Sequence, residues 1–296
     1  MSEEVGASIH QLLHESSKKT KDAAAREVQV LKDGQAVKIA NECGCTVHDV
    51  YREALKAGIS PYRYLRNRES ISIEEQLSLA ESRVAVVGAG GLGGHVILLL
   101  ARLGIGQLVV VDRDVFDETN LNRQALCSDK ALGKSKADEA VLAVESINPG
   151  VEVIPYKVKL DFSNASEILA GSDVVVDALD NVPDRFVLEN TAKKLAVPMV
   201  HGALAGFEGR VMTIFPDDPG LKYLYGKKGA SGDKSKSPEA ILGVPTVTPC
   251  IIAALQAMEV FKIILNRGKT FRNVMVHVDL ETGEIKEFVF QDKKHK

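Results

Sequence analysis

Cysteine is scarce in this sequence. It has four cysteines among 296 residues, and none forms a C-x-x-C pair. A thiolate zinc site is therefore not expected, and four scattered cysteines do not make a disulfide scaffold. The polar N-terminus lacks an apolar signal core, and apolar runs such as VILLLA at 96–101 are far too short to span a membrane. We expect a protein of the reducing cytoplasm without a membrane partner.

The sequence also lacks a charge excess of either sign. Its 37 basic and 40 acidic residues leave a formal net charge of −3. This balance argues against nucleic acid or an anionic membrane surface as a partner. The length predicts one large domain with a small one, which we place at residues 61–296 and 1–60.

The N-terminal region is predicted to be a small helical unit. Residues 1–23 are polar and lysine-rich, which favours a frayed helix or a tail. Residues 34–59 predict two short amphipathic helices, the second capped by Thr46. This outline is also that of a DNA-reading helix-turn-helix, but only Arg52 and Lys56 are basic on the second helix, and neighbouring carboxylates offset them. We favour an accessory unit and keep DNA binding as the alternative.

From Arg83 onward, continuously apolar segments alternate with helical ones. The predicted strands are at 84–87, 108–112, 151–156, 173–179 and 199–204. The predicted helices are at 93–103, 134–147, 163–170 and 183–196. This alternation is typical of an α/β fold, a Rossmann-like and mostly parallel sheet with helices on both faces.

The C-terminal third has a different pattern. Residues 209–216 predict a strand, and 222–245 read as a loop that is rich in lysine. Residues 251–265 predict a helix that is apolar nearly all round and therefore buried. Residues 274–290 predict two strands joined by a turn, which adds antiparallel C-terminal strands to the sheet.

A glycine-rich turn stands between the first of these strands and its helix. The segment GAGGLG at 88–93 satisfies G-x-G-x-x-G through Gly88, Gly90 and Gly93. Such a turn lets a phosphate approach backbone N–H groups at a helix start. Asp112 ends the next strand, where a carboxylate commonly binds ribose hydroxyls. A nucleotide is therefore expected, and NAD, FAD and ATP all remain open.

The residues after Asp112 favour a triphosphate. Basic and amide side chains are dense there: Arg113, Asn120, Asn122, Arg123, Gln124, Lys134 and Lys136. Such groups suit a triphosphate chain and a departing pyrophosphate. For each lysine alone, a solvated helix start is the alternative explanation.

A pair of carboxylates follows another predicted strand, in DALDN at 177–181. Asp177 and Asp180 stand where parallel sheets bind ligands, and Mg²⁺ accepts one or two carboxylates together with phosphate oxygens. The alternative for Asp180 is the N-cap of the following helix.

Taken together, these motifs resemble the ubiquitin-activating superfamily, within it the MoeB/ThiF/HesA-type adenylyltransferases. The resemblance covers about residues 61–290. It is carried by GAGGLG, DRDVFDETNLNRQ (112–124), GKSKA (133–137), INP (147–149), DALDN with Arg185, GALAGFEGRV (202–211) and ALQAMEVFK (254–262).

The resemblance implies an activity and a set of site residues. The C-terminal carboxylate of a ubiquitin-like sulfur carrier would attack ATP, giving an acyl-adenylate in a molybdopterin- or thiamine-type pathway. The implied catalytic residues are Arg66, Arg123, Lys136 and Asp180, with Asp180 holding Mg²⁺. The implied nucleotide contacts are Gly88, Gly90, Gly91, Gly93, Asp112, Asn120, Arg123, Gln124, Lys136, Asp180 and Asn181. Arg66, in RYLRN, would reach the ATP of the partner subunit in a homodimer.

The sequence departs from the resemblance at two places. Leu221 and Leu224 occupy positions where many relatives have zinc-binding cysteines, so no zinc is expected. The crossing loop at 222–245 contains no cysteine, and Cys250 is expected to be a buried structural thiol. We therefore predict adenylation without a covalent relay.

Three alternatives remain at this point. The same fold could adenylate a tRNA base or a peptide. A nucleotide-binding regulator could use residues 34–59 as a helix-turn-helix. An NAD oxidoreductase is the least favoured, because no evident acid/base or substrate-binding half is present.

Overall fold

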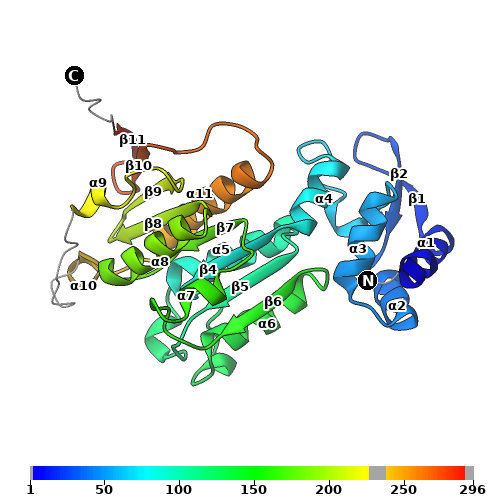
Figure 1. Cartoon of the computed structure of the whole chain (residues 1–296), viewed down its shortest axis with the longest axis horizontal. Coiled ribbons are helices and arrows are strands. Elements are labelled where there is room, and N and C mark those ends of the chain that lie inside the picture. Colours follow the sequence, from blue (N-terminus) through cyan, green and yellow to red (C-terminus); the bar gives the residue numbers. More distant parts are fainter. Residues whose placement is uncertain (1–2, 227–237, 291–296) are drawn as a thin grey trace.

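The computed structural model describes residues 3–226 and 238–290, which form a small N-terminal unit packed against one end of a larger α/β unit (Figure 1). The large unit contains an eight-stranded sheet. Its five parallel strands are, in spatial order, β8 (Met199–Ala205), β7 (Val174–Asp177), β4 (Arg83–Val87), β5 (Gln107–Val111) and β6 (Glu152–Tyr156). Three antiparallel strands extend it beyond β8: β9 (Glu208–Ile214), β10 (Val274–Asp279) and β11 (Glu284–Val289). The predicted sheet is confirmed.

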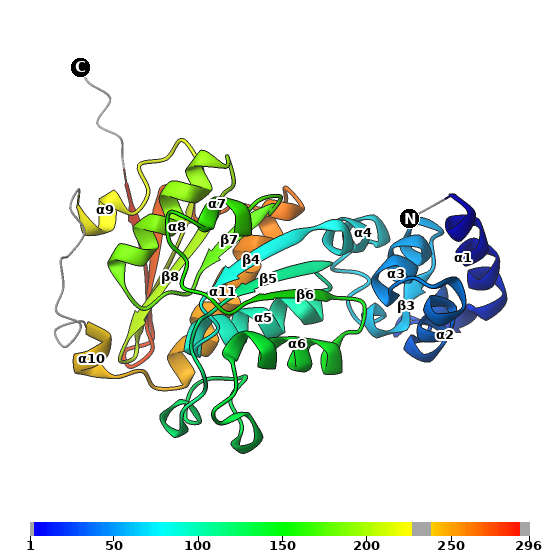
Figure 2. The same ribbon diagram turned by 60° about the horizontal axis from the view of Figure 1, so that its bottom comes forward.

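Helices cover both faces of this sheet because successive apolar side chains of each central strand point to opposite sides. In β4, Val84 and Val86 belong to one core, and Ala85 and Val87 to the other. The first core is covered by α4 (Ile73–Glu81), α5 (Gly91–Leu103), α6 (Lys136–Ile147) and α11 (Val247–Ile264). The second is covered by α7 (Ala165–Ile168) and α8 (Val182–Lys194). Figure 2 shows α5 and α6 on one side of the strands, with α7 and α8 on the other.

Helix α11 is less buried than its sequence predicts. By length and composition it could cross a membrane, but half of it is buried, and it packs on α5, β8 and β9 as a core helix. Its outer side leaves Val247, Ile251 and Met258 exposed. A helix that is apolar nearly all round does not reveal from its sequence which side faces the sheet.

The N-terminal unit contains strands as well as helices. Its elements are α1 (Glu3–Ser16), β1 (Lys18–Lys21), β2 (Glu27–Leu31), α2 (Asp33–Cys43), α3 (Val47–Lys56) and β3 (Ser60–Pro61). The two predicted helices form, and Thr46 caps α3 in a capping box with Asp49. Of the frayed helix or tail expected for residues 1–23, a helix forms, but α1 buries Ile9 and Leu13 and so is anchored to the unit. The expectation of a purely helical unit is wrong, because β1 pairs with β2.

Helix α3 occupies the place of a DNA-reading helix, yet it faces the large unit and packs on α4. The ring of His48 lies 3.2 Å from the carbonyl oxygen of Gly150. Arg52 donates to the carboxylate of Glu81 at 3.2 Å, and the Nζ atom of Lys56 lies 3.9 Å from the same carboxylate. Both basic groups are thus engaged within the chain, which does not support the DNA-binding alternative.

The turn between α6 and β6 joins the two units. Arg63 donates to the carboxylate of Asp33 and to the carbonyl oxygen of Ile147. The ring of Tyr51 lies directly over Gly150, so that a Cβ added at Gly150 would lie 2.2 Å from it. The units therefore share a closely packed seam.

Substitution of a glycine in this seam and of one outside it should change the free energy of unfolding in opposite directions. Gly150→Ala must displace Tyr51 and should lower the free energy of unfolding by about 1–3 kcal/mol. Gly34→Ala, in α2, meets no atom within 4 Å and should raise it by about 0.5 kcal/mol. Urea unfolding of both variants measures the difference. A Gly150→Ala protein as stable as wild type would contradict the packing described.

Candidate nucleotide-binding site

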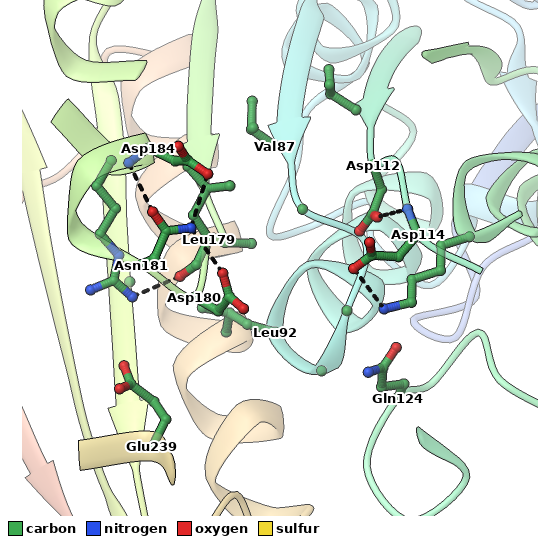
Figure 3. Close-up of a pocket in the computed structure, with 18 of the residues that line it drawn as sticks. Val87, Leu92, Asp112, Asp114, Gln124, Leu179, Asp180, Asn181, Asp184 and Glu239 are labelled. Atoms are coloured by element: carbon green, nitrogen blue, oxygen red, sulfur yellow. Dashed lines mark hydrogen bonds and ion pairs between the residues drawn. The ribbon is translucent and has the colours of Figure 1, made fainter. Parts of the chain in front are cut away.

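A cavity of about 530 Å³ lies where β4, β5 and β7 end. Its lining comes from the turn before α5, the segment after β5, the turn after β7, and parts of β8 and α10 (Pro238–Leu242). Figure 3 shows two facing walls, with Asp112 and Gln124 on one side and Leu179, Asp180 and Asn181 on the other. A crevice at the carboxyl ends of parallel strands is the usual ligand site of such sheets.

The glycines of the first turn serve two purposes. Gly88 has a φ of +98°, and a Cβ there would lie 2.5 Å from the carbonyl oxygen of Ala178. A Cβ at Gly93 would lie 1.8 Å from the carbonyl oxygen of Gly88. Gly90 and Gly91 line the cavity, and a Cβ at either would meet no atom within 3.6 Å.

The four glycines therefore divide by role. Gly88 and Gly93 are required by backbone packing, and Gly93 is buried outside the cavity lining. Gly90 and Gly91 leave the backbone at the start of α5 open to the cavity. The prediction that Gly93 contacts the nucleotide receives no support from its position.

Asp112 is fixed against this turn. Its carboxylate accepts hydrogen bonds from the backbone N–H groups of Ala89 at 2.7 Å and Asp114 at 2.8 Å. Burial raises the pKa of Asp112, while these hydrogen bonds and the charge of Lys136 oppose the rise. The side chain lines the cavity beside the glycine backbone, where sequence analysis expects a ribose contact.

The two lysines of the GKSKA segment lie in different environments. Lys136 begins α6, has a side chain only 9% exposed and lines the cavity. Its Nζ atom lies 3.7 Å from a carboxylate oxygen of Asp114. Lys134 is 55% exposed, pairs with Glu139 and does not line the cavity. Of the two, Lys136 is the one placed to meet a ligand.

A short 3₁₀ helix, η2 (Glu118–Asn120), and the turn after it supply the amide and guanidinium groups. The Asn120 side chain accepts a hydrogen bond from the N–H of Asp117 at 3.1 Å. Arg123 donates to the carbonyl oxygen of Thr119 at 2.7 Å. The Oε1 atom of Gln124 is buried in the cavity wall without a hydrogen-bond partner. A ligand donor would satisfy that atom.

The opposite wall depends on Asp177, which is fully buried and does not line the cavity. Its carboxylate accepts from the N–H of Leu179 at 3.0 Å and lies 2.7 Å from Nδ1 of His201. Asp177 is therefore a structural anchor, and its sequence-based candidacy as a Mg²⁺ ligand is wrong. Asp180 is exposed in the cavity wall.

The N-cap of α8 is Asn181, whose Oδ1 atom accepts from the N–H of Asp184 at 3.0 Å. The capping alternative for Asp180 is thus excluded. Asp180 accepts from the Asn181 side chain at 3.0 Å. Within residues 3–226 and 238–290, no group of three or more His, Cys, Asp or Glu side chains could hold a metal ion. A Mg²⁺ ion here would need phosphate oxygens and water beside Asp180.

Arg66 lies away from the cavity of its own chain. It is exposed in the segment between η1 (Tyr62–Tyr64) and α4, which leads into the N-terminal end of β4. The cavity is at the other end of that strand, and Arg66 does not line it. The structure of one chain therefore does not bring Arg66 together with the other predicted residues.

Leu221 and Leu224, which stand where zinc-binding cysteines were considered, both pack in the hydrophobic core. Leu221 is fully buried, and Leu224 packs against the same core. The region predicted as a loop contains α9 (Lys222–Tyr225) and α10. Part of the predicted crossing loop, residues 227–237, lies outside the described residues.

Cys250 is exposed, so the prediction of a buried thiol is wrong. Thr248 and Ile252 face the core from the same part of α11, which turns Cys250 outward. Its Sγ atom lies 3.5 Å from Nε2 of His95, whose pKa is lowered by burial.

Four charged residues of the cavity wall are not among the sequence-based candidates: Asp114, Lys159, Asp184 and Glu239. Lys159 follows β6 and pairs with Asp184 at 3.0 Å. Glu239 comes from α10. Lys159 could have been found by its position after a predicted strand, as Asp112 was. No comparable signal marks Glu239, which comes from a segment that reads as a loop.

Comparison with known proteins agrees with this geometry. The ThiF family matches residues 64–296. The SAMP-activating enzyme E1 of Haloferax volcanii is 40% identical over 219 residues, which are 73% of this chain and 80% of that protein. A sulfur carrier protein adenylyltransferase of Thermus thermophilus is 37% identical over 202 residues, 66% of this chain and 74% of that protein.

Longer relatives and solved structures are also similar. The adenylyltransferase and sulfurtransferase MOCS3 of Arabidopsis thaliana is 36% identical over 76% of this chain, which spans about half (49%) of its length. Escherichia coli MccB crystallised with ATP has a TM-score of 0.64 at 19% identity, covering 86% of this chain and 82% of MccB. PaaA has a TM-score of 0.63 at 20% identity, covering 82% of each chain. These structures establish the fold alone.

The thiol environments predict an order of alkylation. Burial raises the pKa of the Cys45 and Cys127 thiols, which reduces their thiolate fraction at pH 8. Cys250 is exposed and should react with iodoacetamide at least about fivefold faster than either. Peptide mass spectrometry over time measures the order, with Cys250→Ser as the control. Faster labelling of Cys45 or Cys127 would contradict it.

Proposed function

The chain belongs to the ThiF family, and from that premise we propose that it is an adenylyltransferase that uses ATP to activate the C-terminal carboxylate of a small ubiquitin-like sulfur-carrier protein. One observation carries the proposal. The cavity brings an open glycine backbone, a buried lysine and an arginine together on one wall and an exposed aspartate on the other. The relatives at 37–40% identity, named as adenylyltransferase and activating enzyme, support it.

The residues present fit ATP. The backbone around Gly90 and Gly91 stands at the N-terminus of α5, where N–H groups and the helix dipole favour phosphate. Asp112 would bind the ribose. The phosphate contacts would come from Asn120, Arg123, Gln124 and Lys136. Their mixture of amide and cationic donors suits a triphosphate better than the single diphosphate of NAD.

Asp180 would hold Mg²⁺, which would neutralise phosphate charge when bound. Asn181 keeps the Asp180 carboxylate in the wall by donating to it. Glu239 is a further carboxylate that lines the same cavity, and its charge acts on the guanidinium of Arg185.

The chemistry would need no nucleophilic side chain. A carboxylate oxygen of the carrier would attack the α-phosphorus of ATP, and the bond from that phosphorus to the bridging oxygen of pyrophosphate would break. The products would be an acyl-adenylate and pyrophosphate. Lys136 and Arg123 would stabilise charge on the leaving group, and the rigid walls would hold the reactants in line.

We further propose that two chains form a homodimer in which Arg66 completes the partner's site. Arg66 is exposed and does not line its own cavity, so a role at ATP would require the cavity of another chain. The exposed Val247, Ile251 and Met258 form one apolar stripe on α11 that association would bury. We also propose that the protein acts in the cytoplasm. Residues 61–296 would form the adenylation domain, and residues 1–60 would be an accessory unit.

Exchange of labelled pyrophosphate into ATP tests the reaction. With Mg²⁺ and a carrier ending in Gly-Gly, the wild-type protein should catalyse exchange. Lys136→Gln should lower the rate about 100-fold, because it removes a charge aimed at the phosphates. Lys134→Gln is the matched control and should change it less than about twofold, since that lysine is solvated. Equal losses in both variants, or no exchange with any carrier, would refute the assignment.

Mixed subunits test the arginine. Arg66→Ala and Asp180→Ala proteins should each be inactive alone. Mixed, half of the dimers would carry one intact site, so activity should recover to about a quarter of wild type. Recovery after mixing, measured by the same exchange assay, supports a composite site. Mass spectrometry would first establish that the dimers have exchanged subunits. If activity does not recover in such dimers, the composite site is wrong.

A further inference from the structure

Arg185 is a buried cation that connects the cavity wall to a separate element. Its side chain is 4% exposed, and its Nε atom lies 3.7 Å from the buried carboxylate of Asp177. One terminal nitrogen donates to the carbonyl oxygen of Leu179 at 2.7 Å. The other donates to the hydroxyl of Tyr225 at 2.6 Å. The planar guanidinium can make these contacts at once, which the point charge of a lysine cannot do.

The contact with Leu179 bears directly on Asp180. The N–H of Leu179 donates to Asp177, and its carbonyl oxygen accepts from Arg185. Leu179 is thus held on both sides, and Asp180 is the next residue along the wall (Figure 3). The position of the Asp180 backbone therefore depends on where the guanidinium lies.

Tyr225, at the other end, belongs to a well-anchored helix. It ends α9, whose preceding residue Leu221 is fully buried and donates its N–H to Glu189 at 3.0 Å. The Tyr225 ring packs edge-on against Phe186 and His201, with centroids 6.5 and 6.1 Å apart. The guanidinium of Arg185 lies 5.9 Å from the same ring. The hydroxyl thus offers Arg185 a fixed acceptor.

We infer that Tyr225 and Arg185 are positioning residues for the site. The Tyr225 hydroxyl fixes the guanidinium, the guanidinium fixes the Leu179 carbonyl, and this keeps Asp180 in place for Mg²⁺-ATP. The inference rests on the proposed function, because it takes Asp180 as the carboxylate that meets the metal. Arg185 lines the cavity, but both of its terminal nitrogens donate within the chain, to Tyr225 and Leu179, so we assign it an action on Asp180 through Leu179.

Tyr225→Phe tests the relay because it removes one hydroxyl and leaves the ring and the charge of Arg185 in place. Loss of one such hydrogen bond should raise the Mg²⁺ concentration for half-maximal pyrophosphate exchange about fivefold and lower kcat by a similar factor. The KM for the carrier should not change. Tyr223→Phe is the matched control in the same helix, where the ring stacks on Phe290 at 4.9 Å, and its Mg²⁺ dependence should equal that of wild type.

A double-mutant cycle separates positioning from general packing. In an Arg185→Lys background, Tyr225→Phe should have no further effect on the Mg²⁺ dependence, because the relay is already broken. Additive effects would overturn the inference. A Tyr225→Phe protein with a lower Tm but an unchanged Mg²⁺ dependence would also overturn it, since that is the result of a purely structural role.

The failure of this inference and that of the proposed function are distinguishable. If the wild type catalyses exchange and Tyr225→Phe matches it, the relay is wrong and the function stands. If no carrier supports exchange, Mg²⁺-dependent binding of ATP, measured by calorimetry, replaces the assay. An unchanged Mg²⁺ dependence of binding in Tyr225→Phe then overturns the relay, and a wild type that binds no ATP overturns both.

Discussion

The close approach of three backbone segments at the end of β4 is the constraint on which the site depends. Gly88 lies against Ala178, and the start of α5 lies against Gly88. Neither contact leaves room for a Cβ atom, so the spacing between the two cavity walls is set by backbone rather than by side chains. Interiors packed this closely do not deform gradually. The cavity is consequently a property of the strand–turn–helix unit, and the polar side chains occupy a space already defined.

The charges of the site follow from this arrangement. Asp112 directly follows β5 and Asp177 ends β7, yet their environments differ. Asp177 is enclosed by backbone, imidazole and guanidinium groups, whereas Asp112 retains access to the cavity. A carboxylate without solvent must be satisfied by the protein itself. The fully buried Asp177 therefore maintains the wall, and the carboxylate of that wall that is open to the cavity is Asp180, three residues later.

Much of this arrangement could be predicted from the sequence. The parallel strands were predicted from continuous apolar runs, which occur because both faces of the sheet are covered by helices. The glycine-rich turn was predicted from its position between a strand that ends before Gly88 and a helix that follows it. The sequence could not separate Asp177 from Asp180, or Lys134 from Lys136, because these pairs differ in burial and not in chemistry. It also could not orient α11, whose surface is apolar on nearly every side, and so it placed Cys250 inside.

The N-terminal unit illustrates a different limit of sequence reasoning. The strand Lys18–Lys21 has too few apolar residues to be recognised, and it forms because β2 offers it a partner. Local composition carries no information about a pairing of that kind. The helices of the unit were recognisable, since they bury one face each and one carries its own cap.

The seam at Gly150 has a consequence for how this chain can be divided. The similarity to the ThiF family begins at residue 64, but Tyr51 fills the space that a side chain at position 150 would take. Residues on both sides of the start of the family match therefore pack together in one continuous interior. Removing the first sixty residues would leave an apolar notch beside Gly150 open to water, and it would remove Asp33, the carboxylate that holds Arg63 against the carbonyl of Ile147. The segment that precedes the match to the ThiF family is thus part of the structural support of the matched domain.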